Sequence, residues 1–394
     1  MDFTYTKVPM RTLASGNELS IPVFRFRGDA GKKVYIQANI HGPEVAGVAA
    51  LYRLIPLLCQ EKAVHGEITV VPSINPVGFD QKYNGLQVGY ADPNEYVVGN
   101  FNRTYQLLVK KKPTDDEPVD LDEPKKVILE DFVAAHLRSD VAVIQKDFKA
   151  ELRAAIADLK AKKGRTNLRY GLQLALTAQE MAQDADYIVD LHTDARGLYY
   201  GYAFAENVDT FRYFHVPLLI RLAAEDWDGV FDEAFFLPWL KLQRAFKKAG
   251  RDLSWAELDK EAITLELGNA DEVNTQLALE DAQRIMNFLR HKRVLDGEPT
   301  PPKGEVLATE FKFRDHYYAP AGGLIFWHKK PGEMVKVGEL MATILRPGEV
   351  DAKGAAAEVE IRASEPGLLL VVARSHVAHQ GLEIGSILTH LKAV

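Results

Sequence analysis

The sequence predicts an α/β protein in which a mixed, mostly parallel sheet is flanked by helices and followed by an all-β barrel or sandwich. Three observations carry this prediction. Residues 34–74 have the order strand, helix, strand, which is typical of a parallel sheet. Two further apolar strands lie at residues 186–192 and 262–267. Residues 296–304 then form a linker rich in proline and glycine, and short strands with frequent turns follow it.

The first part of the chain supports the sheet element by element. Residues 34–40 form an apolar strand that stops at a His-Gly-Pro-Glu turn, and residues 45–60 have apolar positions at helical spacing. Residues 68–74 form the next strand. Residues 106–180 are alanine-rich and amphipathic in large part, so we interpret them as a helical insertion. Further predicted elements are a helix at 168–183, a strand at 197–204 and a closing helix at 275–295.

These elements divide the chain of 394 residues into two predicted domains, residues 1–297 and 305–394. The second domain contains a weak internal repeat. Gly323-Leu324-Ile325 in its first half corresponds to Gly367-Leu368-Leu369 in its second half. Two similar halves with glycines at their turns are typical of a small β-sandwich or flattened barrel.

Composition excludes several classes of function. The net charge is −7, from 48 basic and 55 acidic residues, so nothing favours a partner such as nucleic acid or an anionic membrane. The single cysteine, Cys59, excludes an internal disulfide and a cysteine-based zinc site, and its apolar neighbours predict a buried thiol. Residues 1–7 lack the features of a signal peptide, and no apolar stretch reaches the roughly 18 to 20 residues of a membrane span. We therefore expect a cytoplasmic protein.

Three residues have the chemistry of a zinc site. His41 and Glu44 lie where a strand ends and a helix begins, and His192 ends another apolar strand. Functional sites of open α/β sheets gather at the carboxyl ends of strands. Two histidines and one glutamate form a catalytic zinc set that leaves one coordination position open. Each residue alone is better explained as an ordinary strand-end residue, but the set of three favours a metal site.

Four other polar residues have side chains that suit a role beside these candidate ligands. Asp190 belongs to an apolar strand and has the chemistry to orient an imidazole from behind. Glu266 lies among apolar residues of a later strand, where it is either a general base or an outward-facing strand residue. Asn102 and Arg103 follow a glycine-containing loop, and arginine binds carboxylates through two parallel hydrogen bonds.

The order of these motifs resembles the aspartoacylase/succinylglutamate desuccinylase family, a branch of the zinc carboxypeptidase superfamily. The resemblance covers roughly residues 30 to 295. The motifs that carry it are His41-Gly42-Pro43-Glu44, Asn75-Pro76-Val77-Gly78-Phe79, Asn102-Arg103, Asp190-Leu191-His192-Thr193 and Glu266-Leu267-Gly268. Residues 305–394 also resemble the β-domain of that family, which has the shape of a biotinyl or lipoyl carrier.

The resemblance implies a zinc-dependent hydrolase that cleaves the amide bond of a small N-acyl amino acid, such as acetylaspartate or succinylglutamate. It implies that His41, Glu44 and His192 hold one zinc ion per chain. It implies further that Glu266 activates the attacking water and that Asn102 and Arg103 hold a carboxylate of the substrate. The expected partner is therefore a small molecule.

One departure from the family pattern concerns an arginine. Family members usually carry another arginine between the Asn-Pro-x-Gly segment and Asn-Arg, and it helps to polarise the scissile carbonyl. Between Phe79 and Asn102 this chain has no arginine, and Lys82 is the only cation there. Lys82, zinc alone, or an arginine from elsewhere such as Arg196 would have to take that role.

Two alternative functions stay open at this stage. A metallocarboxypeptidase acting on peptides or cell-wall fragments would need an open groove rather than a closed pocket. A catalytically silent protein that binds a metal or ligand would explain the missing arginine. The C-terminal domain is expected to serve in shape, in assembly of a homo-oligomer or as a lid, because Lys353 lacks the usual context of a biotin or lipoate attachment site.

Overall fold

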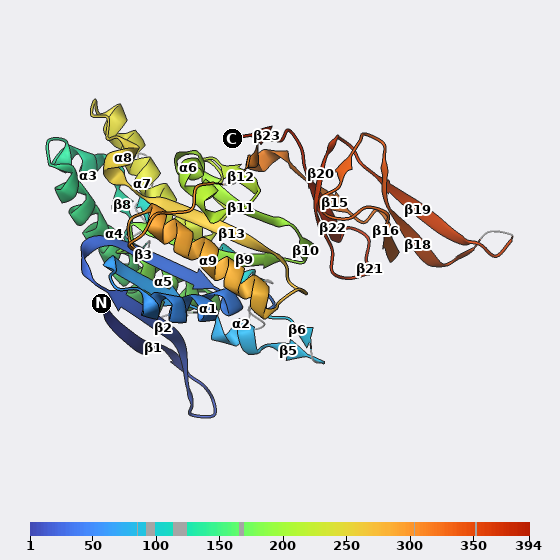
Figure 1. Cartoon of the computed structure of the whole chain (residues 1–394), viewed down its shortest axis with the longest axis horizontal. Coiled ribbons are helices and arrows are strands. Elements are labelled where there is room, and N and C mark those ends of the chain that lie inside the picture. The colour runs from blue at the N-terminus through green and yellow to red at the C-terminus, as the bar shows by residue number, and fades with distance from the viewer. Residues whose placement is uncertain (85, 92–98, 113–123, 165–168, 303, 351–352) are drawn as a thin grey trace. The chain divides into compact units, whose positions relative to one another are not determined.

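The computed structural model describes residues 1–84, 86–91, 99–112, 124–164, 169–302, 304–350 and 353–394 (Figure 1). The chain forms two compact units, unit 1 and unit 2. Unit 1 consists of Met1–His192, Ala224–Thr264 and Thr275–Thr300, and unit 2 consists of Thr193–Ala223, Leu265–Asn274 and Pro301–Val394. The two predicted domains, residues 1–297 and 305–394, stay a prediction.

Unit 1 contains a mixed sheet whose strands follow the order β1-β2-β4-β3-β9-β13. The strands β3 (Asp29–Ala38), β4 (His65–Val71) and β9 (Tyr187–Asp194) run parallel to one another. The strands β1 (Asp2–Thr12) and β2 (Glu18–Arg27) form an antiparallel edge (Figure 1). The strand β13 spans Glu261–Asn269, and the unit boundary runs through both β9 and β13. The predicted mostly parallel sheet is confirmed.

Helix α1 (Ala46–Gln60) connects β3 to β4 and packs beside α9 (Thr275–His291). Its apolar residues are buried because spacing of three or four places them on one side of a helix; they include Val48, Leu51, Leu54 and Leu58. The expectation of a buried Cys59 was wrong, since this thiol is exposed. Successive helical residues point about 100° apart, so an inward Leu58 turns Cys59 outward.

Further helices of unit 1 pack against one another, and all of them except the helix Tyr170–Ala182 contribute residues to an apolar cluster that includes Phe132, Phe148 and Trp239. The rings of Phe148 and Trp239 meet edge to face with centroids 4.9 Å apart. These helices are α3 (Leu129–His136), α4 (Val141–Gly164), α5 (Tyr170–Ala182), α7 (Phe231–Lys248) and α8 (Trp255–Leu258). The first three confirm the helical character predicted for residues 106–180, of which 113–123 and 165–168 lie outside the described residues.

Unit 2 contains three parallel strands, β11 (Tyr199–Phe204), β12 (Leu218–Leu222) and β14 (Leu307–Glu310). They pack on apolar residues from the end of the chain, so that Tyr200 and Ile220 share a buried cluster with Leu370 and Leu388. The short strand β23 (Lys392–Ala393) pairs antiparallel with β14.

The remaining part of unit 2 consists of two antiparallel sheets, which confirm the all-β prediction for the C-terminal region. One has the order β10-β20-β22-β15 with β17 beside β20, and the other has the order β19-β18-β16-β21. The two repeated Gly-Leu motifs begin β16 and β20, one in each sheet. The strands are β10 (Arg196–Gly197), β15 (Arg314–Tyr318), β16 (Gly323–Trp327), β17 (Met334–Val335), β18 (Leu340–Val350), β19 (Ala356–Arg362), β20 (Gly367–Val372), β21 (Val377–Ala378) and β22 (Glu383–Leu388).

Short elements complete the described chain. They are α2 (Pro76–Asp80), β5 (Lys82–Tyr83), β6 (Leu86–Gln87), η1 (Phe101–Arg103), β7 (Val109–Lys110), β8 (Val127–Ile128), η2 (Ala205–Asn207), α6 (Val208–Phe211), η3 (Arg212–Phe214) and η4 (Phe311–Phe313). Across the described ranges, no helix combines the length and the apolar character that a membrane span requires.

Candidate metal centre

The loop that carries His41 follows β3 and is held in place by asparagine side chains. Asn39 has a left-handed backbone conformation (φ 68°), and its Nδ2 donates a hydrogen bond to the His41 carbonyl at 2.9 Å. Asn75 Nδ2 donates to the carbonyl of the residue before His41 at 2.7 Å, and Asn75 Oδ1 accepts from the Gly78 amide at 2.9 Å. The Asn-Pro-Val-Gly segment therefore braces the loop.

Two glycines allow the loop to approach α2 closely. A Cβ atom on Gly42 would lie 1.9 Å from the carbonyl oxygen of Gly78. A Cβ atom on Gly78 would lie 2.6 Å from Nδ2 of Asn75. Both positions therefore require glycine, because any larger residue would push the loop away from its brace.

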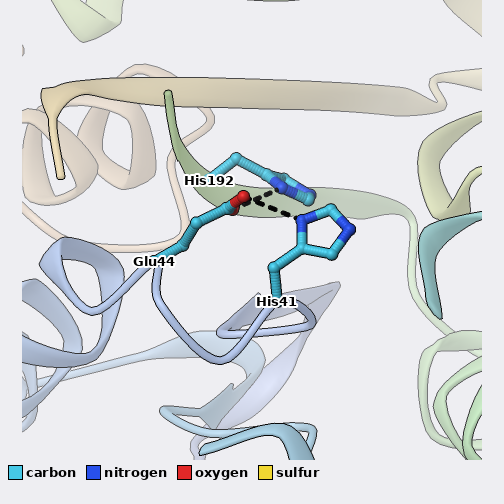
Figure 2. A group of neighbouring side chains, drawn as sticks. All are labelled: His41, Glu44 and His192. Atoms are coloured by element: carbon cyan, nitrogen blue, oxygen red, sulfur yellow. Dashed lines mark hydrogen bonds and ion pairs between the residues drawn. The ribbon is translucent and has the colours of Figure 1, made fainter. Parts of the chain in front are cut away.

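His41, Glu44 and His192 come together at one buried point (Figure 2). Their candidate ligand atoms all lie within 4.8 Å of one another. Nδ1 of His41 lies 2.8 Å from Glu44 Oε1, and Nδ1 of His192 lies 2.9 Å from Glu44 Oε2. His192 reaches this point from the carboxyl half of β9, and the other two come from the loop after the neighbouring β3.

The other nitrogen of each imidazole faces an oxygen atom. His41 Nε2 lies 2.7 Å from Asn100 Oδ1, which also accepts a hydrogen bond from the Asn102 amide at 2.7 Å. His192 Nε2 lies 3.1 Å from Asp190 Oδ2. Oxygen acceptors favour a proton on both Nε2 atoms, so each Nδ1 can offer a lone pair to a cation that replaces the proton between it and the Glu44 carboxylate. Two lone pairs and a carboxylate that face one another suit a cation between them.

The charges of the cluster reinforce one another. Burial raises the pKa of Glu44, but the charges of His41 and His192 and their hydrogen bonds outweigh it and lower the pKa to about 2. Burial lowers the pKa of His192, but the carboxylates of Asp190 and Glu44 outweigh it and hold the pKa well above its ordinary value. In the metal-free protein Glu44 is therefore ionised, and a proton on His192 takes the place of a metal cation.

The donor set fits zinc. Two neutral imidazole nitrogens and one carboxylate oxygen are the ligands of a catalytic zinc site, and oxygen acceptors behind the imidazoles are the usual means of orienting them. Asp190 is buried and contacts His192, and its role in orienting that imidazole stays a prediction. Asn100 has the corresponding place behind His41, which sequence reasoning missed.

Asn102 and Arg103 lie in η1, close to His192. Asn102 is buried, its Oδ1 accepts a hydrogen bond from the Phe231 amide at 3.2 Å, and its Nδ2 lies 3.4 Å from His192 Nε2. Arg103 is exposed, and its Nε pairs with Asp228 Oδ2 at 2.7 Å while its Nη1 donates to the Asn102 carbonyl at 2.6 Å. The backbone next to the metal centre thus also fixes the arginine.

The remaining predicted site residues belong to other elements of the chain. Lys82 belongs to β5 of unit 1 and is exposed. Arg196 belongs to unit 2, where its Nε lies 3.6 Å from Asp271 and its Nη1 lies 3.2 Å from His376 Nε2. Glu266 belongs to the part of β13 in unit 2 and is half-buried.

Glu266 shares its surroundings in unit 2 with a half-buried arginine, Arg314. Its charge acts on Tyr200, Tyr202 and Arg314. Arg314 donates to both tyrosine hydroxyls. Burial lowers the pKa of Arg314, but these tyrosines and nearby carboxylates outweigh burial and raise the pKa well above its ordinary value. The cation therefore keeps its charge at every ordinary pH.

Two imidazoles and a carboxylate at the carboxyl ends of parallel strands form a candidate metal site with the donor set of zinc hydrolases of α/β fold. The sequence model of the succinylglutamate desuccinylase/aspartoacylase catalytic domain matches residues 30–143. The chain therefore resembles the succinylglutamate desuccinylase/aspartoacylase family in sequence over these residues, and in structure over its whole length. Members of this family are typically zinc-dependent amidohydrolases that act on small acylated amino acids.

Solved structures resemble the chain over its whole length. A protein assigned to this family from Shewanella amazonensis SB2B is 29% identical, with 100% of each chain covered and a TM-score of 0.85. A protein with the same assignment from Shewanella frigidimarina NCIMB 400 is 28% identical, with 99% of this chain and 98% of that chain covered and a TM-score of 0.86. The ectoine utilization protein EutE (DoeB) from Ruegeria pomeroyi shares the fold at 17% identity, with 98% and 94% covered and a TM-score of 0.62. No curated protein matches the chain in sequence.

Proposed function

We propose that the protein is a zinc-dependent deacylase that hydrolyses the amide bond of a small N-acyl amino acid or a similar carboxylate-bearing compound. The observation that carries the proposal is the convergence of His41 Nδ1, His192 Nδ1 and the Glu44 carboxylate at one buried point. These residues would hold one zinc ion per chain. When bound, zinc supplies a Lewis acid that polarises the acyl carbonyl and makes the attacking water more acidic.

Glu266 is the proposed general base. Its carboxylate takes a proton from the attacking water as the water oxygen bonds to the acyl carbon, and returns it to the nitrogen as the carbon–nitrogen bond breaks. A free amine and a carboxylic acid result. The Glu266-Leu267-Gly268 motif supports this role, as does the position of a half-buried glutamate between the buried Leu265 and Leu267.

Asn102 and Arg103 are the proposed binding residues for a substrate carboxylate. The exposed guanidinium of Arg103 is held through its Nε by Asp228, and such a fixed cation positions an acid for reaction. Lys82 and Arg196 are the proposed substitutes for the missing arginine. A loss of kcat in K82M but not in R196M, or the reverse, would identify which of them acts.

Metal analysis tests the ligand set. We expect one zinc per chain by mass spectrometry of the purified protein, and none in H192A. As a control, H65A removes a partly exposed histidine that pairs with Asp296, and it should keep zinc. A wild-type protein that neither contains zinc nor takes it up after chelation and re-addition would overturn the proposal.

Turnover tests the base and the substrate class. E266Q should keep its zinc and lose hydrolysis of N-acetyl and N-succinyl amino acids, whereas E272Q, at an exposed position, should keep both. Release of C-terminal residues from peptides instead would indicate the carboxypeptidase alternative. A zinc-loaded protein that turns over neither class would be the catalytically silent binding protein.

A further inference from the structure

Gln37 is a fully buried amide in β3, flanked by the fully buried Ile36 and Ala38. A buried amide costs roughly 1–3 kcal/mol unless its hydrogen bonds are satisfied, so its presence in this strand calls for a partner. The parallel register of β3 and β9 places Gln37 directly beside Asp190.

A chain of hydrogen bonds leads from Gln37 to the metal centre. Gln37 Nε2 donates to Asp190 Oδ1 at 3.1 Å. The other oxygen of that carboxylate, Oδ2, lies 3.1 Å from His192 Nε2. His192 Nδ1 then faces Glu44 Oε2 at 2.9 Å. Each residue of this chain is at least nine-tenths buried, so water does not compete for these bonds.

The orientation of the Gln37 amide is fixed from its other side. The Tyr35 hydroxyl donates to Gln37 Oε1 at 3.0 Å, and Tyr35 is itself buried. Burial raises the pKa of Tyr35 well above its ordinary value, so the hydroxyl keeps the proton that it donates. With Oε1 accepting from Tyr35, Nε2 must face Asp190, which as a carboxylate only accepts.

We propose that Gln37 is a positioning residue of the metal centre. By holding the Asp190 carboxylate it fixes His192 with the proton on Nε2 and the lone pair of Nδ1 directed at the metal. The inference rests on the proposed zinc site and does not depend on the deacylase reaction.

The test measures zinc affinity rather than activity. We compare the zinc dissociation constants of wild type, Q37M and Y35F by competition with a chromophoric chelator. Partners behind a metal ligand typically change affinity by about 10- to 100-fold, and Gln37 acts one bond further out, so Q37M should weaken binding about tenfold. Y35F leaves the amide in place but frees its orientation, so it should weaken binding about threefold.

Gln179 provides a matched control. It is also a buried glutamine of unit 1, but its side chain bonds the backbone of Gln106 at 3.1 and 2.8 Å. Q179M should therefore lower stability without changing zinc affinity. The absorption spectrum of the cobalt-loaded protein reports ligand geometry, and it should change in Q37M and not in Q179M.

The outcomes separate the two proposals. A wild type that binds no zinc would overturn both the metal centre and the role of Gln37. A zinc-binding wild type with a Q37M variant that binds within twofold of it, and with the same cobalt spectrum, would overturn the role of Gln37 alone. If circular dichroism shows that Q37M does not fold, the affinity and spectrum of Y35F decide the matter, and wild-type values there would refute the inference.

Discussion

Asp186 ties together three strands at the end of the sheet away from His192. It directly precedes β9, and its Oδ1 accepts from Lys149 at 3.1 Å and from Lys260 at 2.5 Å. Its Oδ2 accepts from the backbone amide of Lys33 in β3 at 3.0 Å. Lys260 directly precedes β13 and is fully buried. Replacing Asp186 with Asn therefore leaves a buried ammonium group without its carboxylate.

The structure sets the size of the expected loss. Removing one partner of a buried ion pair costs about 3–5 kcal/mol. We expect about 3 kcal/mol for D186N, because Lys260 also lies 4.7 Å from the centre of the Trp239 ring, which stabilises its charge. In addition, burial outweighs the charge of Asp186 and lowers the pKa of Lys260 to about 8, so the lysine can shed its proton at modest cost.

Urea unfolding at pH 7, followed by circular dichroism, measures this loss. The double variant D186N/K260M should be more stable than D186N, because it removes the uncompensated cation. A loss below about 1 kcal/mol in D186N, or a double variant no more stable than D186N, would refute the reasoning.

Acid unfolding gives a second readout. Burial raises the pKa of Asp186, but the charges of Lys260 and Lys149 outweigh it and lower the pKa to about 2 from its ordinary 3.8. Because folding lowers the pKa of Asp186, its ionised carboxylate adds about 2 kcal/mol to the free energy of unfolding when the pH is above the ordinary pKa of 3.8. This contribution is lost as the pH falls through about 2. Wild-type stability should therefore fall more steeply than that of D186N between pH 4 and pH 2.

Two further substitutions test the loops around the metal centre. G42A should reduce zinc binding at least tenfold and lower the melting temperature, because its Cβ would lie 1.9 Å from the Gly78 carbonyl; normal zinc content would contradict the close approach. D228N should raise KM about threefold to fivefold and leave kcat unchanged, since an exposed ion pair to Arg103 is worth up to about 1 kcal/mol. A lower KM would mean that Asp228 competes with the substrate instead of orienting Arg103.

Sequence alone could single out the candidate ligands that the structure brings together because two kinds of signal agree. Apolar strands mark where the carboxyl edge of a parallel sheet lies, and His41 and His192 both occur there. Residues at the carboxyl ends of neighbouring parallel strands lie close together, however far apart those strands are along the chain. Glu44 joins them because it follows His41 by three residues in the turn after the first of these strands.

Asp190 was predicted behind His192, but Asn100 and Gln37 were missed because no local pattern marks them. Asn100 reaches His41 from a distant loop, and Gln37 reaches Asp190 through strand register. Gln37 did leave a signal, a glutamine within an otherwise apolar strand, although the sequence does not show which way it points. The burial of Cys59 was predicted wrongly for a related reason, since a run of apolar letters does not say which side of a helix each one occupies.

The shared apolar cluster of unit 2 limits how the gene can be shortened. Tyr200 and Ile220 come from the middle of the chain, but Leu370 and Leu388, which cover them, come from its last residues. A truncated chain that stops at residue 297 would leave this apolar surface bare and would be expected to aggregate. The C-terminal β region therefore cannot be replaced by another domain on its own. The residues in the middle of the chain that pack against it would have to be changed as well.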